Sequence, residues 1–189
     1  MIIKRNDILY MVRVAYLNAI CLAFLSIQFV VPVAYLLLFP TVPAIVALQL
    51  FLVSVSMALV SAGMLIGISF FVFGIDVGLW SVVYVITGCA LGVAWRFGSS
   101  WFIRAFITTI AAAASLVGVL ISLSWITGIS LSEVDTVVKG LSPYRELPLP
   151  FLFGVSVLII GLLIWLVSDQ LVSRVLGQLG EMQEHKTKS

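Results

Sequence analysis

The sequence predicts an all-α integral membrane protein, a bundle of six transmembrane helices that forms a single domain over residues 1–183. Two observations carry this prediction. Of the 189 residues, 62% are hydrophobic and 10% are charged, whereas a soluble domain keeps about a quarter of its residues charged. Apolar runs long enough to cross a bilayer core of about 30 Å recur along the chain, and the mean hydropathy is +1.25.

The first predicted span covers residues 8–39 and bends at Pro32, because proline lacks the N–H that a helix interior needs. Lys4 and Arg5 precede this span, but no short apolar core ends in a small-residue cleavage site. We therefore expect a retained first helix rather than a cleaved signal peptide.

Three alanines of the first span form what we call the alanine ridge: Ala15, Ala19 and Ala23 lie four residues apart and so on one helix face. Small residues let a second helix approach closely, and close packing drives helix association in lipid. Their spacing fits equally a contact within the chain and a surface that docks a partner.

Residues 44–73 are apolar throughout, and as one helix they would measure about 45 Å, well beyond the bilayer core. Two short helices over residues 44–60 and 62–75 fit the membrane better, with Ser61–Gly63 supplying the turn between them.

The positions of the basic residues support the two short helices, because basic residues gather on the cytoplasmic side of membrane proteins. Reading residues 44–73 as one helix moves Arg96 and Arg104 outside and lowers the count of cytoplasmic basic residues to six. Two short helices leave only Lys139 and Arg145 outside, with the N-terminus inside. Eight of the ten basic residues are then cytoplasmic: Lys4, Arg5, Arg13, Arg96, Arg104, Arg174, Lys186 and Lys188.

The remaining spans follow from that choice. We predict an outer turn at residues 74–78, and an outer loop between the fifth and sixth spans that carries a short interfacial helix over residues 130–140. An amphipathic cytoplasmic extension at residues 169–183 and a disordered polar tail at 184–189 end the chain. The last three spans are expected at residues 79–95, 101–126 and 151–168.

Several classes of function lack their signals in this sequence. No ionisable residue is expected at mid-membrane depth, where proton relays and intramembrane catalysis need one, and no catalytic or nucleotide-binding motif occurs. We therefore expect no enzyme, no cofactor, no metal and no nucleic-acid partner. Cys21 and Cys89 are interpreted as packing residues, and His185 lies in the polar tail.

Polar and aromatic residues gather instead in the predicted outer half, as the pocket of a small solute requires. An interfacial aromatic belt with helix-packing hydrogen bonds explains most of them as well. Gln28 is the hardest to explain in that way, because an amide facing lipid is costly. The candidate solute-binding residues are Gln28, Tyr35, Gln49, Asp76, Trp80, Tyr84, Trp125 and Tyr144.

Taken together, this layout resembles the S components, the substrate-binding subunits of energy-coupling-factor transporters. Six spans, two short helices after the first and a low alanine ridge carry the likeness. Within that group, two stretches over roughly residues 10–130 resemble the YybS-like bacterial membrane proteins. They are Pro32–Pro43, and the Gly88-xxx-Gly92-xxx-Arg96 element followed by residues 126–130.

The resemblance implies a subunit of the bacterial inner membrane that captures a small solute from outside and docks on a transmembrane coupling protein with ATPase subunits. The alanine ridge would be the docking face. YybS-like proteins are usually longer, with further C-terminal helices. The six-helix layout also resembles MreD, a scaffold of the cell-elongation machinery that transports nothing, and an outer half without a cavity would favour that alternative.

Overall fold

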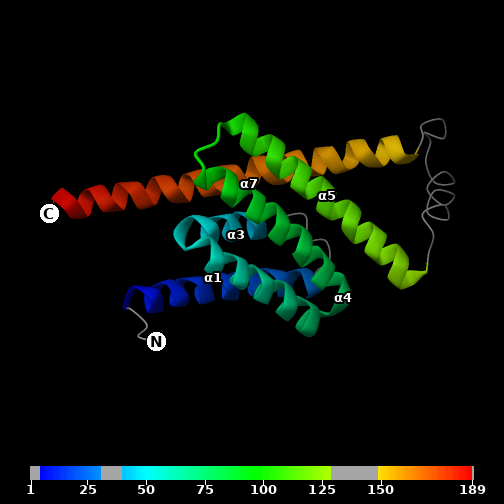
Figure 1. Ribbon diagram of the computed structural model, residues 1–189, viewed down its shortest axis with the longest axis horizontal. Helices are drawn as coiled ribbons and strands as arrows, with labels where there is room; N and C mark the ends of the chain where they lie inside the picture. The colour runs from blue at the N-terminus through cyan, green and yellow to red at the C-terminus, as the bar shows by residue number, and fades with distance from the viewer. Residues whose placement is uncertain (1–4, 31–39, 129–148, 189) are drawn as a thin grey trace.

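The computed structural model of this chain describes residues 5–30, 40–128 and 149–188. These residues form an all-α structure of five helices, as the composition predicts (Figure 1). The helices are α1 (Arg5–Val30), α3 (Thr41–Leu52), α4 (Val55–Arg96), α5 (Trp101–Thr127) and α7 (Leu149–Lys188). The predicted helix over residues 130–140 and the bend at Pro32 lie outside the described residues.

Four of these helices contain stretches long and apolar enough to cross a membrane, as expected of a multi-pass membrane protein. The stretches are Ile8–Ile27, Val55–Arg96, Trp101–Thr127 and Leu158–Gln178. Helix α3 has 12 residues and is about 18 Å long, too short to cross the bilayer core at right angles.

Helix α4 folds back on itself at Gly74. The backbone of Gly74 has φ 85° and ψ −173°, a conformation that L side chains rarely adopt, and two helical segments of α4 leave this residue in different directions (Figure 1). The segments pack together, because a Cβ atom added at Gly78 would overlap the ring of Phe70. The turn predicted over residues 74–78 is therefore made by Gly74 alone, and the helix resumes at Ile75.

Replacing Gly74 with alanine should destabilise the fold by about 1–3 kcal/mol, because a Cβ forces this backbone into a sparsely populated region. Gly118→Ala is the matched control, since Gly118 lies in helix α5 with no atom within 4 Å of an added Cβ. Thermal unfolding in detergent measures the difference. Equal melting temperatures for both variants would show that the Gly74 backbone can relax.

The chain breaks between α3 and α4 at Val53–Ser54, not at the predicted turn Ser61–Gly63, which lies inside α4. Ser54 caps α4, because its side chain accepts a hydrogen bond from the backbone N–H of Met57 at 3.4 Å. Nη1 of Arg96 donates to the carbonyl oxygens of Leu50 at 3.1 Å and Val53 at 3.0 Å. These bonds satisfy carbonyls that the end of α3 leaves without helical partners.

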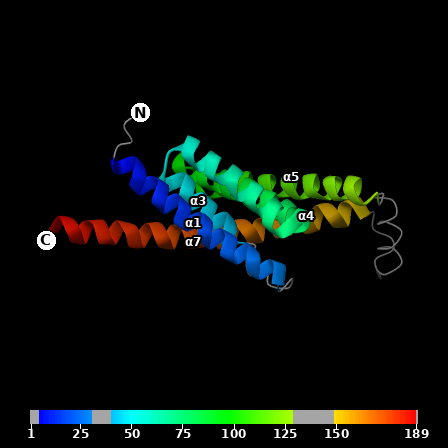
Figure 2. The same cartoon turned by 90° about the horizontal axis from the view of Figure 1, so that it is seen from below.

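Helix α5 lies where the sequence predicts it. The side chain of Ser100 accepts a hydrogen bond from the N–H of Ile103 at its start, and Gly128 ends it with φ 70°. Helix α7 has 40 residues and is about 60 Å long, so it runs without a break through the predicted extension at 169–183 and on to Lys188. Its C-terminal part extends past the other helices (Figures 1 and 2).

Glycines bring α3 against the second segment of α4. A Cβ at Gly88 would lie 2.6 Å from the carbonyl oxygen of Pro43, and a Cβ at Gly92 would lie 2.8 Å from Cβ of Leu50. Gly88 and Gly92, four residues apart on one helix face, therefore allow the backbones of α3 and α4 to come close together. Gly63 and Gly67, which repeat that spacing, have no atom within 4 Å of an added Cβ.

The main core draws on all five described helices. Its buried side chains include Cys21 and Leu25 of α1, Tyr84 of α4 and Ile164 of α7. Cys21 is fully buried and Cys89 is half-buried against the same core, so both pack as the sequence predicts. Helix α1 thus has one face in the core, while its other residues include Val12 and Tyr16, which are largely exposed.

Candidate functional site

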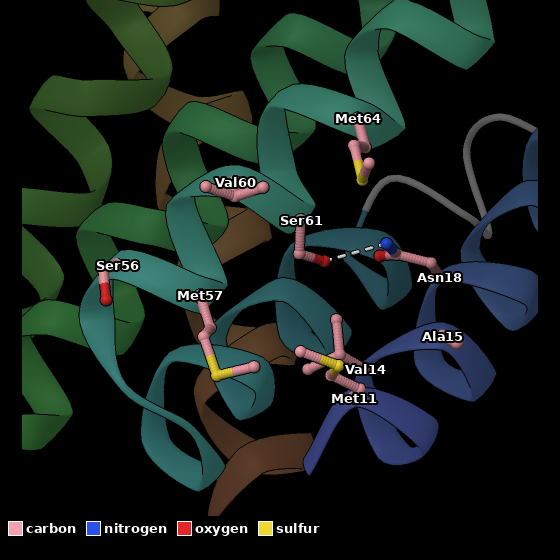
Figure 3. A pocket seen from close by; sticks show the side chains of 9 residues that line it. All are labelled: Met11, Val14, Ala15, Asn18, Ser56, Met57, Val60, Ser61 and Met64. Atoms are coloured by element: carbon pink, nitrogen blue, oxygen red, sulfur yellow. Dashed lines mark hydrogen bonds between the residues drawn. The ribbon is translucent and has the colours of Figure 1, made fainter. Parts of the chain in front are cut away.

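A groove of about 550 Å³ opens between α1 and the first segment of α4 (Figure 3). We call it the α1–α4 groove. Most of its lining is apolar, and three methionines contribute flexible side chains. The lining residues are Met11, Val14, Ala15, Asn18, Ser56, Met57, Val60, Ser61 and Met64.

Three polar side chains from three helices form a closed hydrogen-bonded ring at this groove, which we call the Asn18 ring. Nδ2 of Asn18 donates to Oγ of Ser61 at 2.8 Å, as Figure 3 shows. Oγ of Ser61 donates to Oε1 of Gln49 at 3.2 Å, and Nε2 of Gln49 donates back to Oδ1 of Asn18 at 2.8 Å. Each member both donates and accepts, so the ring ties α1, α3 and α4 together.

The members of the ring differ in burial. Gln49 and Ser61 are buried, whereas Asn18 is half-buried and lines the groove. An amide has two N–H donors and two acceptor lone pairs, and the ring uses one of each on Asn18. Among the described residues, Asn18 therefore keeps one donor and one acceptor for a molecule in the groove.

The alanine ridge is exposed. Ala15, Ala19 and Ala23 are all solvent- or lipid-accessible, although Cys21 and Leu25 on another face of α1 are buried. Ala15 also lines the α1–α4 groove. The described helices therefore leave these three alanines uncovered.

The predicted solute-binding residues are spread over the structure. Tyr84 is fully buried in the main core, Trp80 is half-buried against it, and Trp125 is 86% exposed. Asp76 is exposed beside the turn at Gly74. The side chain of Gln28 and all of Tyr35 and Tyr144 lie outside the described residues.

Gln49 does not join the other predicted solute-binding residues. It lies near the C-terminal end of α3, in contact with Ser61, and about 20 Å of helix separates Ser61 from Gly74 at 1.5 Å per residue. A helix predicted over residues 44–60 has Gln49 near its outer start. The observed α3 ends at Leu52, so Gln49 lies near the other end.

A second polar cluster, the Asp169 clasp, holds α7 against the ends of α4 and α5. Nε of Arg104 contacts Oδ1 of Asp169 at 2.9 Å, and Nε1 of Trp95 donates to the same oxygen at 2.7 Å. Cζ of Arg104 lies 4.1 Å from the centroid of the Trp95 ring, and its Nη1 donates to the carbonyl of Ser99. Both charged side chains are 16% exposed, so the clasp is largely shielded from solvent.

Sequence reasoning missed Asn18, Ser61 and Asp169. Asn18 carries the same signal as Gln28, because an amide in a spanning helix is costly unless it points into the bundle. Asp169 was placed just beyond the sixth span, whereas the apolar stretch of α7 runs on to Gln178. The signal available for Asp169 was Arg104, a cation in the first turns of an apolar helix that needs a nearby anion.

In residues 5–30, 40–128 and 149–188, no group of three His, Cys, Asp or Glu side chains is placed to hold a metal ion. The α1–α4 groove offers hydroxyl and amide groups without a charged partner. Comparison with protein-family models, curated proteins and solved structures finds no match to this chain.

Proposed function

We propose that this protein is a membrane interaction subunit that docks a transmembrane helix of a partner on the alanine ridge of α1. The exposure of Ala15, Ala19 and Ala23 carries the proposal. A helix face that meets only lipid gains nothing from small residues, whereas a helix–helix contact depends on them for close approach. Ala15 borders the α1–α4 groove, which gives a docked helix a concave surface beside the ridge.

The resemblance to MreD suggests the plainest form of this function, a scaffold that transports nothing. The scatter of the predicted solute-binding residues supports it, since Tyr84 is core and Trp125 faces outward. Docking would then be the whole activity of the described helices.

A second candidate is the substrate-binding subunit of an energy-coupling-factor importer, docked on a coupling protein. The fold-back of α4 at Gly74 supports this form, because its two segments together with α1, α3, α5 and α7 give the six helical segments that the resemblance implies. The solute would be captured at the Gly74 end of the bundle, where Asp76 and Trp80 lie.

For either form we propose both termini in the cytoplasm of a bacterial cell, with the protein in the inner membrane. The end of the bundle at Arg96 would be the cytoplasmic end. Arg96 and Arg104 lie there with Arg174, which follows Asp169 of the clasp, and this clustering agrees with the positive-inside rule.

Substituting leucine at both Ala15 and Ala19 should reduce partner recovery from native membranes about tenfold, because two larger side chains hold the helices apart. The measurement is quantitative mass spectrometry of an affinity pull-down, beside a melting curve of the purified protein. Ala114→Leu, at an exposed alanine of α5, is the control and should change neither the partner recovery nor the melting temperature.

A double variant that melts like the wild type and retains every partner would contradict docking on the ridge. A double variant that loses much of its own stability would show instead that the ridge packs within the chain.

A further inference from the structure

The α1–α4 groove has the makeup of a small-molecule site. Its volume of about 550 Å³ lies in the range of ligand pockets, and an apolar lining with a few converging polar groups is typical of them. Met11, Met57 and Met64 line it with unbranched, polarisable side chains that adapt to irregular apolar ligands.

Its polar groups determine what kind of head the ligand can have. Asn18 keeps one N–H donor and one carbonyl lone pair beyond the Asn18 ring, whereas the hydroxyl of Ser56 lies 3.3 Å from that of Ser54 and is already hydrogen-bonded to it. A hydroxyl or ester carbonyl can pair with these free groups of Asn18. A hydrocarbon without a polar head would leave the spare N–H and carbonyl of Asn18 unsatisfied.

The absence of charge in the lining excludes an ionised head. Every lining residue is uncharged, and an unpaired charge in a low-dielectric groove is costly. Arg96 lies at the turn that precedes Ser56, but its Nη1 is held by the carbonyl oxygens of Leu50 and Val53. A neutral head therefore fits this groove better than a phosphate or carboxylate.

We propose that the α1–α4 groove binds one neutral single-chain amphiphile that enters sideways from the bilayer. Its apolar chain lies along the methionines, and its hydroxyl or ester head pairs with Asn18. This inference goes beyond docking on the alanine ridge, because the groove would be occupied whether or not a partner is present. A partner helix on Ala15 would then cover the bound molecule.

The test uses the full-length protein in nanodiscs and a monoacylglycerol that carries a photoreactive diazirine on its chain. Mass spectrometry should map the adducts to peptides that contain Met11, Met57 or Met64. Unlabelled monooleoylglycerol should compete about tenfold better than lysophosphatidylglycerol of the same chain, since the latter brings a charged phosphate into the groove. The corresponding alkene, which lacks a head, should also compete poorly.

Two matched variants locate the site. Val60 is 63% exposed and lines the groove, whereas Val72 is 60% exposed on the same segment of α4 and does not line it. Val60→Trp should fill the groove and lower adduct yield about tenfold, while Val72→Trp should leave it unchanged. Slow reaction of the buried Cys21 with a thiol reagent checks that both variants fold.

Adducts elsewhere, or equal yields from both folded variants, would overturn the proposal. Equal competition by the charged and neutral lipids would show ordinary contact with bilayer lipid and would also overturn it. A second outcome is that no amphiphile binds but Val60→Trp loses protein partners. The groove would then receive a partner helix, which supports docking on the alanine ridge and overturns the amphiphile site. If amphiphile binding persists while leucine at Ala15 and Ala19 changes no partner, docking fails and this inference survives.

Discussion

Replacing Asp169 with leucine should lower the free energy of unfolding by about 2–4 kcal/mol, the largest loss expected from a single side chain near the ends of α4 and α5. The substitution leaves the guanidinium of Arg104 largely buried without its carboxylate, and it removes the acceptor of the Trp95 indole N–H. Residual exposure of 16% on each charged side chain keeps the loss below that of a fully buried pair.

Thermal unfolding followed with a thiol-reactive dye measures this loss, because the buried Cys21 becomes accessible only as the core opens. Asp76→Leu is the control. Asp76 is exposed beside Gly74, so this substitution should change the melting temperature little. The double variant Asp169→Leu with Arg104→Leu should lose less than the sum of the two single losses, because it leaves no unpaired charge. Equal melting of the Asp169 and Asp76 variants would show that the clasp contributes nothing to stability.

The paired substitution Gly88→Ala with Gly92→Ala should destabilise the protein by about 2–5 kcal/mol, because each added methyl group collides with helix α3. The Gly88 methyl meets the carbonyl of Pro43 at 2.6 Å, and the Gly92 methyl meets Leu50 and Ala47 at 2.8 and 2.9 Å. Backbone atoms cannot move aside as a flexible side chain can, so α3 must shift as a whole.

Gly63→Ala with Gly67→Ala provides the comparison, because this pair has the same spacing in the same helix but no neighbour within 4 Å. Its stability should stay the same or rise by up to about 1 kcal/mol per site, since alanine is the better helix former. The same thiol-dye melting curves measure both pairs. If the Gly88 pair melts like the Gly63 pair, α3 does not depend on close approach to α4.

The helices that could be predicted from sequence are those with chemical signals at their ends. Helix α5 begins after the Ser100 cap and ends at Gly128, and both signals stand in the sequence. The break between α3 and α4 was misplaced because hydropathy is uniform across it. Ser54 and Ser61 are equally plausible turn residues there, and the deciding interaction comes from Arg96, more than 40 positions away.

The candidate site was predicted in part. The alanine ridge follows from spacing alone, and its exposure could not be read from that spacing. The Asn18 ring could not be predicted, because it forms only where α1, α3 and α4 meet, and that meeting point depends on where α3 ends. A turn predicted at Ser61 places that residue in a loop. It also places Gln49 near the start of a helix over residues 44–60, whereas Gln49 lies near the C-terminal end of α3.

The shortness of α3 imposes an order on the assembly of this protein in the membrane. A segment of 12 residues cannot anchor itself across a bilayer, whereas the two segments of α4, each of about 20 residues, can enter together as a hairpin around Gly74. The glycine face at Gly88 and Gly92 exists only after the second segment of α4 has been made, and α3 packs on that face. Helix α3 is synthesised before α4 but finds its place after it, so during synthesis it must wait at the membrane surface or in the insertion machinery.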